Sequence, residues 1–476
     1  MKKIYRFALC IALLTVMTFG FAGCNEEAGD EIVLRINSWE EYIDEGDWDE
    51  EEAVDLQDDL VICPESSIVE DFEEWFYETY GKKVRVEYST FGTNEELYNQ
   101  MSMGDTYDLV CPSEYMIMKL MTEGKLKAFS EEFFDKTKEH NYYAKGLSPY
   151  IERVFEELSI NNQSLKNYAA GYMWGTLGIV YNPEYVSHEE AAHWDLLLNE
   201  KYNRRITIKD SVRDAFFAGN SIHNYSMITQ NEFVNSSDYA KRLSEMINAT
   251  DKATVDAVEY ILTRIKENVY SFETDSGKAD MVSGKVVANQ QWSGDAVYTL
   301  DQAEEDGVYL CYSAPEEATN LWFDGWCMLE SGIDGDADKQ MAAEAFVNFI
   351  SRPDNVVRNM YYIGYTSVIS GGEDSTVLDY INWTYGMDEE TAAEEEVELV
   401  EYPIGYFFTG NMNETDEEYI IITSEDQTRR QLYAQYPTKE VMDRSVVMAY
   451  FDKEGNDRIN QMWLNVRCFD IYSLFD

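Results

Sequence analysis

Strand and helix patterns alternate along residues 32–111, and this alternation constrains the fold more than any other feature of the chain. Short apolar runs at 32–37, 82–88 and 107–111 predict strands, and helical patterns separate them. Such an order is typical of parallel strands joined by right-handed crossovers. Ligands of such sheets bind at the carboxyl ends of the strands, so we expect a site in the loops that follow them.

The first helix of this region is marked at both of its ends. Ser66 or Ser67 can cap its start, and Gly81 is placed to end it in the left-handed conformation. Thr93 or Asn94 can cap the start of the next helix in the same way. The first helix is predicted to pack on a sheet through an apolar stripe formed by Ile68, Phe72, Trp75, Phe76 and Tyr80.

A second alternating region begins at residues 175–181 and contains a predicted helix over about 253–267. Another helix, within 342–353, is predicted to stop at Pro353. Without its leader the chain keeps about 450 residues, which is too many for one compact core. We therefore expect two α/β lobes.

Two segments are rich in acids and are predicted as insertions. Ten of the sixteen residues from Asp44 to Asp59 are acidic, which predicts a solvated loop because such a run cannot bury itself. The Gly- and acid-rich segment 371–418 predicts a second long excursion.

The chain begins with the pattern of an export signal. Basic residues within the first six precede an almost wholly apolar run at 7–19, and residues 21–24 resemble a bacterial lipobox. That resemblance implies a signal peptide over 1–24, cleavage before Cys24, lipidation of its thiol and a polar tether over 25–30. An uncleaved membrane helix is the alternative, but the run is shorter than the roughly 20 residues that span a bilayer.

The charge of the chain restricts its partners. There are 91 Asp and Glu residues against 37 Lys and Arg, so the net charge is -54. Nucleic acids and anionic lipid headgroups would be repelled, so we expect no nucleic-acid partner. A cationic ligand suits this field, but taken alone the charge is better explained as acidity that only keeps a surface protein soluble.

No motif supports catalysis or metal binding. HExxH, GxSxG, Walker-type, GxGxxG and paired CxxC patterns do not occur, and the four histidines show no metal spacing. We expect a protein that is not an enzyme and holds no cofactor and no metal.

Four clusters place aromatic rings beside acids or hydroxyls directly after apolar runs, at residues 39–42, 113–115, 292–295 and 322–324. In an extended segment Trp322 and Asp324 share a face, so a ring and a carboxylate project together. This combination suits an organic ammonium group. Any single cluster is better explained by core packing with a surface acid, so the inference rests on all four.

With these clusters in place, the chain resembles the spermidine/putrescine-binding protein family of bacterial ABC transporters over most of residues 32–366. The motifs that carry the resemblance lie at 36–43, 107–115, 174–182, 210–216, 292–294, 322–324 and 346–365. The resemblance implies an α/β, two-lobed periplasmic-binding-protein-like fold of type II. Each lobe would be a mixed, mainly parallel sheet flanked by helices, with the ligand cleft between the lobes. Lobe I would comprise 31–174 plus 325–366, and lobe II 175–324 plus 367–476.

Carried over by position, the resemblance implies a ligand site built from both lobes. The walls would be aromatic: Trp39, Tyr42, Tyr115, Trp292 and Trp322. Ser113 and Glu41 would assist with an amine, and Asp214 and Asp324 would face the ammonium groups. Ser211 stands where spermidine binders have a second Asp, which predicts a weaker amine contact and a shorter diamine or a shifted spermidine, unless Asp210 compensates.

The expected function is therefore capture of putrescine and/or spermidine for an ABC importer. The protein would be an exported monomer, lipid-anchored to the outer face of the cell membrane or periplasmic where an outer membrane is present. Its partners would be a membrane permease and a separate cytoplasmic ATPase, because the chain has no phosphate-binding loop.

Three alternatives stay open. The same fold could bind another small cation, an amino-acid derivative or a sugar. An exported hydrolase could use Asp210 and Asp214 as paired carboxylates. A surface adhesion lipoprotein could use the acidic insertions as its contact surface.

Overall fold

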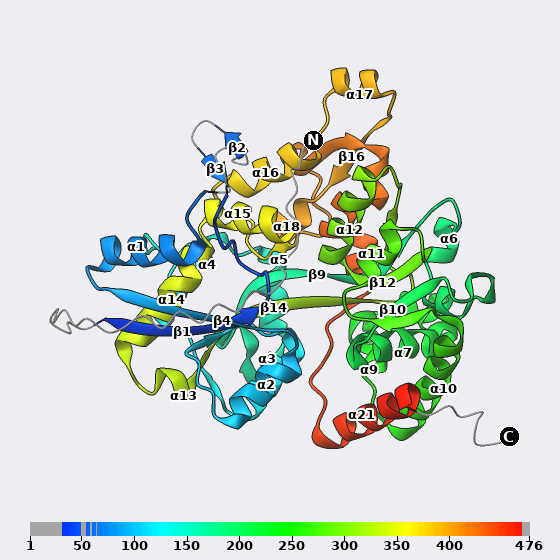
Figure 1. The fold of residues 1–476 in the computed structure, drawn as a ribbon, viewed down its shortest axis with the longest axis horizontal. Coiled ribbons are helices and arrows are strands. Elements are labelled where there is room, and N and C mark those ends of the chain that lie inside the picture. The colour runs from blue at the N-terminus through cyan, green and yellow to red at the C-terminus, as the bar shows by residue number, and fades with distance from the viewer. Residues whose placement is uncertain (1–30, 49–53, 58–59, 63, 469–476) are drawn as a thin grey trace, which may run out of the picture.

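The computed structural model describes residues 31–48, 54–57, 60–62 and 64–468. The predicted signal peptide, Cys24 and the tether lie outside these residues. Across the described part of the chain, none of the helices combines the length and apolarity that crossing a membrane requires. Figure 1 shows two bodies of helices around a shared sheet, with β1 and β4 in the first body and β10 and β12 in the second.

Twelve of the described strands form one sheet: β1 (Ile32–Trp39), β4 (Val84–Phe91), β5 (Leu109–Val110), β6 (Leu126–Lys127), β9 (Ala170–Tyr181), β10 (Ile206–Lys209), β11 (Ser271–Glu273), β12 (Ala288–Trp292), β13 (Cys311–Ser313), β14 (Thr319–Leu329), β15 (Thr366–Ser367) and β18 (Ser445–Val446). The main strand order is β11-β10-β12-β9-β14-β5-β1-β4. The outer strands pair in parallel, β1 with β4 and β5, and β10 with β11 and β12. This confirms the parallel sheets that the strand and helix alternation predicts.

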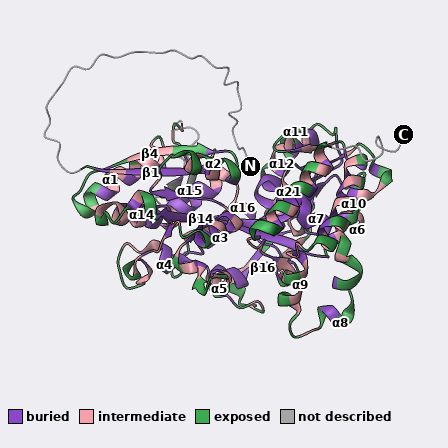
Figure 2. Cartoon of the chain, turned by 90° about the horizontal axis from the view of Figure 1, so that it is seen from below, coloured by how far each residue is buried: buried purple, intermediate pink, exposed green. Residues whose placement is uncertain are grey.

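Two long antiparallel strands, β9 and β14, join the two bodies through the middle of the molecule (Figure 1). Every residue of both strands is buried. Trp174 of β9 packs in a first hydrophobic cluster, whereas Leu177 and Tyr181 pack in a second. The strand β9 therefore enters both cores, whereas the apolar residues of β14 pack in the first. In Figure 2 the buried residues follow the strands, and exposed residues cover the outer helices.

The first body is covered by helices whose ends agree with the local sequence signals. Ser67 caps α1 in a capping box with Glu70, and Gly81 ends it with a φ of 66°. Thr93 caps α2. The helices are α1 (Ile68–Tyr80), α2 (Asn94–Met103), α3 (Glu114–Thr122), α4 (Tyr142–Gly146), α5 (Pro149–Glu157), α13 (Glu330–Ile333), α14 (Ala337–Ile350) and α15 (Pro353–Ile363). The predicted stop before Pro353 is confirmed, and the proline itself begins α15.

The second body contains the predicted helix over about 253–267, which the structure extends to Lys252–Asn268. Its helices are α6 (His188–Ala191), α7 (Val212–Ile228), α8 (Asn231–Val234), α9 (Tyr239–Ile247), α10 (Lys252–Asn268), α11 (Gly277–Val282), α12 (Ser293–Glu305) and α21 (Lys453–Cys468). The short 3-10 helices of the chain span Glu131–Phe134, Leu165–Asn167, Trp194–Leu198, Glu200–Tyr202, Glu417–Tyr419 and Glu425–Arg429.

The prediction of a wholly solvated loop over 44–59 is wrong at its first residue. Asp44 is fully buried, because its carboxylate accepts a hydrogen bond from the guanidinium of Arg358. Later in the segment, β2 (Val54–Gln57) and β3 (Leu60–Ile62) form a hairpin in which Leu56 and Ile62 are buried. The ion pair between Arg358 and Asp44 offsets part of the cost of removing that carboxylate from water.

The excursion over 371–418 packs on the protein. It includes α16 (Thr376–Tyr385), α17 (Glu389–Glu395), β16 (Leu399–Pro403) and α18 (Gly405–Thr409), and β16 pairs with β17 (Ile420–Ser424). The remaining elements are β7 (Ser159–Ile160), β8 (Gln163–Ser164), α19 (Gln431–Gln435) and α20 (Lys439–Asp443). Apart from Ala392, the buried hydrophobic residues from Val377 to Met442 belong to the first cluster, and those from Val446 to Val466 belong to the second. The exact division into lobes stays a prediction.

Candidate functional site

The predicted site residues lie where strands end and helices begin. Trp39 ends β1, and Ser113 immediately precedes α3. Ser211 is the N-cap of α7, and Trp292 joins β12 to α12. Asp324 lies within β14, a central strand whose apolar residues pack in the first cluster. The positions after parallel strands are those at which ligands of such sheets bind.

Asp324 is a buried acid that is only partly satisfied. The Tyr42 hydroxyl donates a hydrogen bond of 2.5 Å to Oδ2, whereas Oδ1 is buried and makes no hydrogen bond. Burial raises the pKa of Asp324 to about 6, and the nearby hydroxyls of Tyr42 and Ser113 counteract part of that rise. Ser113 also pairs with Asp324 in an isolated antiparallel bridge. The carboxylate therefore keeps an acceptor free for a donor from outside the protein.

Glu114 is a second incompletely satisfied acid next to Asp324. Its Oε2 is buried and has no hydrogen-bond partner. Burial, and then the charge of Asp324, raise the pKa of Glu114 to about 8. At neutral pH Asp324 is therefore largely ionised and Glu114 largely protonated, and a cation bound beside them would favour the ionised form of both acids.

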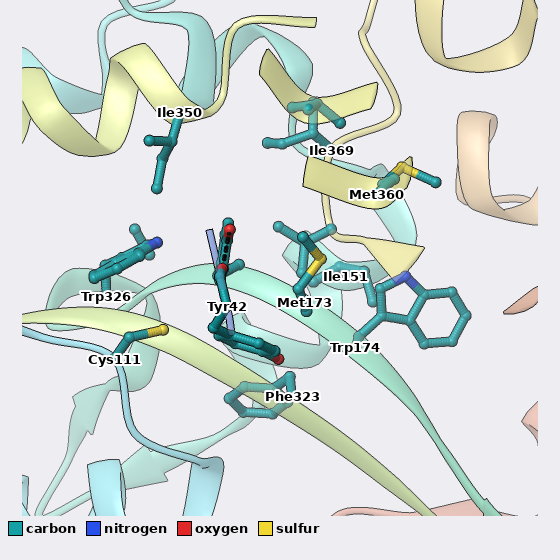
Figure 3. Packing of buried hydrophobic residues seen from close by; sticks show 14 of the residues in the cluster. Tyr42, Cys111, Ile151, Met173, Trp174, Phe323, Trp326, Ile350, Met360 and Ile369 are labelled. Carbon is teal, nitrogen blue, oxygen red and sulfur yellow. Dashed lines mark hydrogen bonds between the residues drawn. The ribbon is translucent and has the colours of Figure 1, made fainter. Parts of the chain in front are cut away.

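Aromatic rings from distant segments pack around these acids. Tyr365 lies between Tyr42 and Trp322, with ring centroids 5.8 and 5.5 Å away. Tyr172 packs edge-on against Tyr42 at 5.3 Å and donates a hydrogen bond to its carbonyl oxygen. Figure 3 shows Tyr42 among buried residues of the first hydrophobic cluster, including Cys111 and Phe323. The indole nitrogens of Trp39 and Trp322 are buried without a hydrogen-bond partner, and unpaired polar groups of this kind are rare in protein interiors.

The second predicted acid, Asp214, lies in the first turn of α7. Its Oδ1 accepts a hydrogen bond of 3.4 Å from the indole of Trp292, and Ser211 caps the helix at its backbone nitrogen, 3.3 Å away. Burial raises the pKa of Asp214, and Ser211 and Trp292 oppose that rise. Ser211 thus acts on Asp214 through the helix cap. Asp210 is engaged elsewhere, because its carboxylate forms a 2.9 Å ion pair with Arg467.

Two cations of the protein lie against predicted ligand rings. The Arg213 guanidinium is 4.7 Å from the ring centroid of Tyr115, and Lys209 Nζ is 4.6 Å from that of Trp292. The sequence pattern does not single out either cation, although both lie within or beside the matched segment 210–216. A search for positive charges beside that motif would have found them.

Contacts connect the predicted residues into a circuit that spans both bodies. Asn94 donates hydrogen bonds to the hydroxyls of Ser113 and Tyr115, at 3.1 and 3.0 Å. Arg213, which stacks on Tyr115, is the chain neighbour of Asp214. The circuit is completed by three links described above, from Asp214 to Trp292, from Trp322 through Tyr365 to Tyr42, and from Tyr42 to Asp324.

Gly175 allows the remaining approach in this circuit. A Cβ atom at Gly175 would lie 2.3 Å from Ser293 Oγ and 2.6 Å from the ring of Trp322. Only a glycine lets the start of α12 and the Trp322 indole meet over β9. Trp292, the N-cap of α12, is thereby held near Trp322.

Glu41 is the least integrated of the predicted residues. It is exposed and has a φ of 53°. Its charge contributes, after burial, to the raised pKa of Tyr298 on α12, so it lies near the second body. Tyr365, Glu114 and Asn94 belong to the site by their contacts, but the sequence analysis assigns them no role in ligand binding. Among the described residues, no group of three His, Cys, Asp or Glu side chains is arranged to hold a metal ion.

Comparisons with known proteins agree with this architecture. A sequence profile described as bacterial extracellular solute-binding protein matches residues 67–378. The spermidine/putrescine-binding periplasmic protein of Salmonella typhimurium is 25% identical over 284 residues, which cover 59% of this chain and 70% of that protein. The putrescine-binding periplasmic protein SpuD of Pseudomonas aeruginosa is 25% identical over 355 residues, which cover 72% of this chain and 80% of that protein.

Solved structures show the same fold. The spermidine/putrescine ABC transporter substrate-binding protein PotD of Streptococcus pneumoniae superposes with a TM-score of 0.57 at 23% identity, covering 92% of this chain and 98% of that one. The Tp0655 (TpPotD) lipoprotein of Treponema pallidum gives 0.58 at 15% identity, covering 91% and 99%. These similarities confirm the predicted α/β, type II periplasmic-binding-protein fold.

Proposed function

Because the chain belongs to the bacterial extracellular solute-binding protein family, we propose that it captures polyamines, putrescine and/or spermidine, and delivers them to an ABC importer. The names of its relatives support this ligand class. The protein acts by binding, without catalysis. Of the alternatives, a hydrolase using Asp210 and Asp214 is disfavoured, because Arg467 already holds the Asp210 carboxylate.

One observation carries the proposal: Asp324 Oδ1 is a buried acceptor without a donor, beside the aromatic rings of Tyr42 and Trp322. An alkylammonium supplies N–H donors to the carboxylate and a positive charge, while its methylene chain packs on the rings. The neighbouring Glu114 adds a second acceptor where the bound cation favours its ionised form. The net charge of -54 attracts cations to the protein from a distance.

A second candidate ligand is favoured by a different observation. The unpaired indole nitrogens of Trp39 and Trp322 are donors, and an ammonium offers them no acceptor. A ligand with both an amine and an oxygen acceptor, such as an amino-acid derivative, would satisfy them together with Asp324. Competition calorimetry with arginine and with a monosaccharide separates this candidate from the polyamines.

Calorimetry on Asp324→Asn tests the polyamine proposal. Loss of a charge-assisted hydrogen bond of about 1.5 to 3 kcal/mol predicts an affinity at least about tenfold weaker for putrescine or spermidine. Asp457→Asn, on the exposed face of α21, is the matched control and is expected to bind as the native protein does. Equal affinity in Asp324→Asn and the control would refute the assignment.

The finer assignments follow from the same proposal. The mature protein is a monomer anchored by a lipid on Cys24 at the outer face of the cell membrane, or in the periplasm, where it meets a permease driven by a cytoplasmic ATPase. Cys24→Ser tests the anchor: the variant is expected to leave the membrane fraction while keeping its polyamine affinity. Retention of the variant in membranes would contradict lipid anchoring.

A further inference from the structure

Lys209 is a buried ammonium in surroundings that match a binding site for an alkylamine. Its side chain is 1% exposed. Nζ lies 4.6 Å from the ring centroid of Trp292 and 3.1 Å from Asp295 Oδ2, and it donates a hydrogen bond of 2.8 Å to the carbonyl oxygen of Thr274. Glu273 Oε1 is 3.9 Å away. Ring, carboxylates and carbonyl surround the ammonium as they would a ligand amine.

This position adjoins the predicted ligand site through Trp292. The indole nitrogen of Trp292 donates a hydrogen bond to Asp214, and Lys209 Nζ lies over the ring of the same residue. The charge of Lys209 also opposes the rise in the pKa of Asp214. Lys209 therefore lies immediately beyond Asp214, on the side of Asp295.

Asp295 connects the ammonium to the rings of the first body. The Tyr365 hydroxyl donates a hydrogen bond of 2.9 Å to Asp295 Oδ1, and the Tyr365 ring packs against Trp322. Burial opposes ionisation of Asp295, but Lys209 and Lys278 outweigh it, so the pKa of Asp295 is lowered. The carboxylate is ionised and already neutralised, which leaves it no free charge for a ligand.

We propose that Lys209 is a resident ammonium that fills a third cation position and restricts the ligand to two ammonium groups. In this arrangement one ligand amine binds at Asp324 and the other at Asp214, both beside aromatic rings. A third amine is repelled by the positive charge of Lys209. The inference rests on the proposed polyamine function and deepens it to a preference for diamines over triamines. Lys209 is thus a specificity-determining residue.

Lys209→Ala tests this role by vacating the position while leaving Asp295 and Trp292 in place. A third ammonium of spermidine then replaces Nζ, so spermidine affinity is expected to rise at least about tenfold relative to putrescine. The double variant Lys209→Ala/Asp295→Asn lacks the receiving carboxylate and is expected to lose that gain. A purely structural lysine would instead change the affinity for both ligands by the same factor.

Lys278→Ala is the matched control. It removes a different ammonium, 3.7 Å from Asp295, and does not change Lys209. Its spermidine-to-putrescine ratio is expected to equal that of the native protein. If Lys209→Ala does not fold, the inference is tested on the native protein. Its affinity for spermidine is expected to be no higher than its affinity for putrescine. A native preference for spermidine of about tenfold, or an unchanged ratio in folded Lys209→Ala, overturns the inference. Binding of neither polyamine by the native protein contradicts the proposed function itself.

Discussion

The hydroxyl of Tyr42 and the carboxylate of Asp324, 282 residues apart in the chain, share a buried hydrogen bond of 2.5 Å. This bond orients Asp324 so that Oδ2 is satisfied and Oδ1 is left free. It also joins the loop after β1 to β14, one of the two long central strands. A ligand that binds Oδ1 therefore contacts a carboxylate whose position is already set.

Tyr42→Phe removes this donor and keeps the ring. The lost hydrogen bond raises the pKa of Asp324 further above its ordinary value, so less of the carboxylate is ionised at neutral pH. Polyamine affinity at pH 7 is expected to fall about fivefold to twentyfold in calorimetry. Tyr77→Phe, at an exposed position on α1, is the control and should bind normally. Unchanged affinity in Tyr42→Phe would show that the bond does not prepare the site.

Ligand affinity is expected to depend on pH through Asp324. Its pKa of about 6 in the free protein means that the carboxylate is largely protonated at pH 5 and largely ionised at pH 7. A cation needs the ionised form, so affinity falls as the pH falls through 6, and binding releases protons near that pH. Calorimetry in buffers of different ionisation enthalpy measures this release. A flat affinity between pH 5 and 7 would exclude Asp324 as the ammonium partner.

The stability of the ligand-free protein is expected to show the opposite trend. The pKa values of Asp324 and Glu114 are raised to about 6 and about 8, so the folded state holds their protons more tightly than the unfolded state does. Their contribution to the free energy of unfolding therefore increases as the pH falls from about 8 towards 4. Urea unfolding of the native protein and Glu114→Gln checks this, because the variant should lose much of the dependence above pH 6. A native-like slope in Glu114→Gln would contradict it.

Gly294 at the start of α12 tests the packing of Tyr365. A Cβ atom there would lie 1.9 Å from Tyr365 Cδ1, and because a methyl group cannot turn away, Tyr365 itself would have to move. Gly294→Ala is expected to displace the Tyr365 ring, to lower the free energy of unfolding by about 1 to 3 kcal/mol and to weaken ligand binding. Gly92→Ala is the control, since its nearest neighbour is the flexible end of Glu96 at 3.3 Å. Native stability of Gly294→Ala would disprove the tight contact.

Local signals account for what could be predicted from the sequence. The ends of α1 follow from Ser67 and Gly81, because caps act within one turn of a helix. The positions of Trp39 at the end of a strand and of Ser113 before a helix follow from the strand and helix alternation. The resemblance to a known family adds the pairing of these segments with Asp214 and Trp322, which lie far along the chain.

Long-range partners account for what could not be predicted. In the sequence Asp44 is one acid in a run predicted to be solvated. Its partner Arg358 is 314 residues away, and only the fold brings the two together. In the same way Lys209 and Asp295 are separated by 86 residues, and neither position indicates the other. Burial and charge pairing of this kind depend on tertiary packing, which composition and periodicity do not contain.

A crystal structure of the protein grown with putrescine tests the central claim most directly. The account predicts a ligand nitrogen within hydrogen-bond distance of Asp324 Oδ1, with the methylene chain against Tyr42 and Trp322 and Lys209 Nζ still on Trp292. A ligand bound elsewhere, with Asp324 Oδ1 unoccupied, would contradict the account.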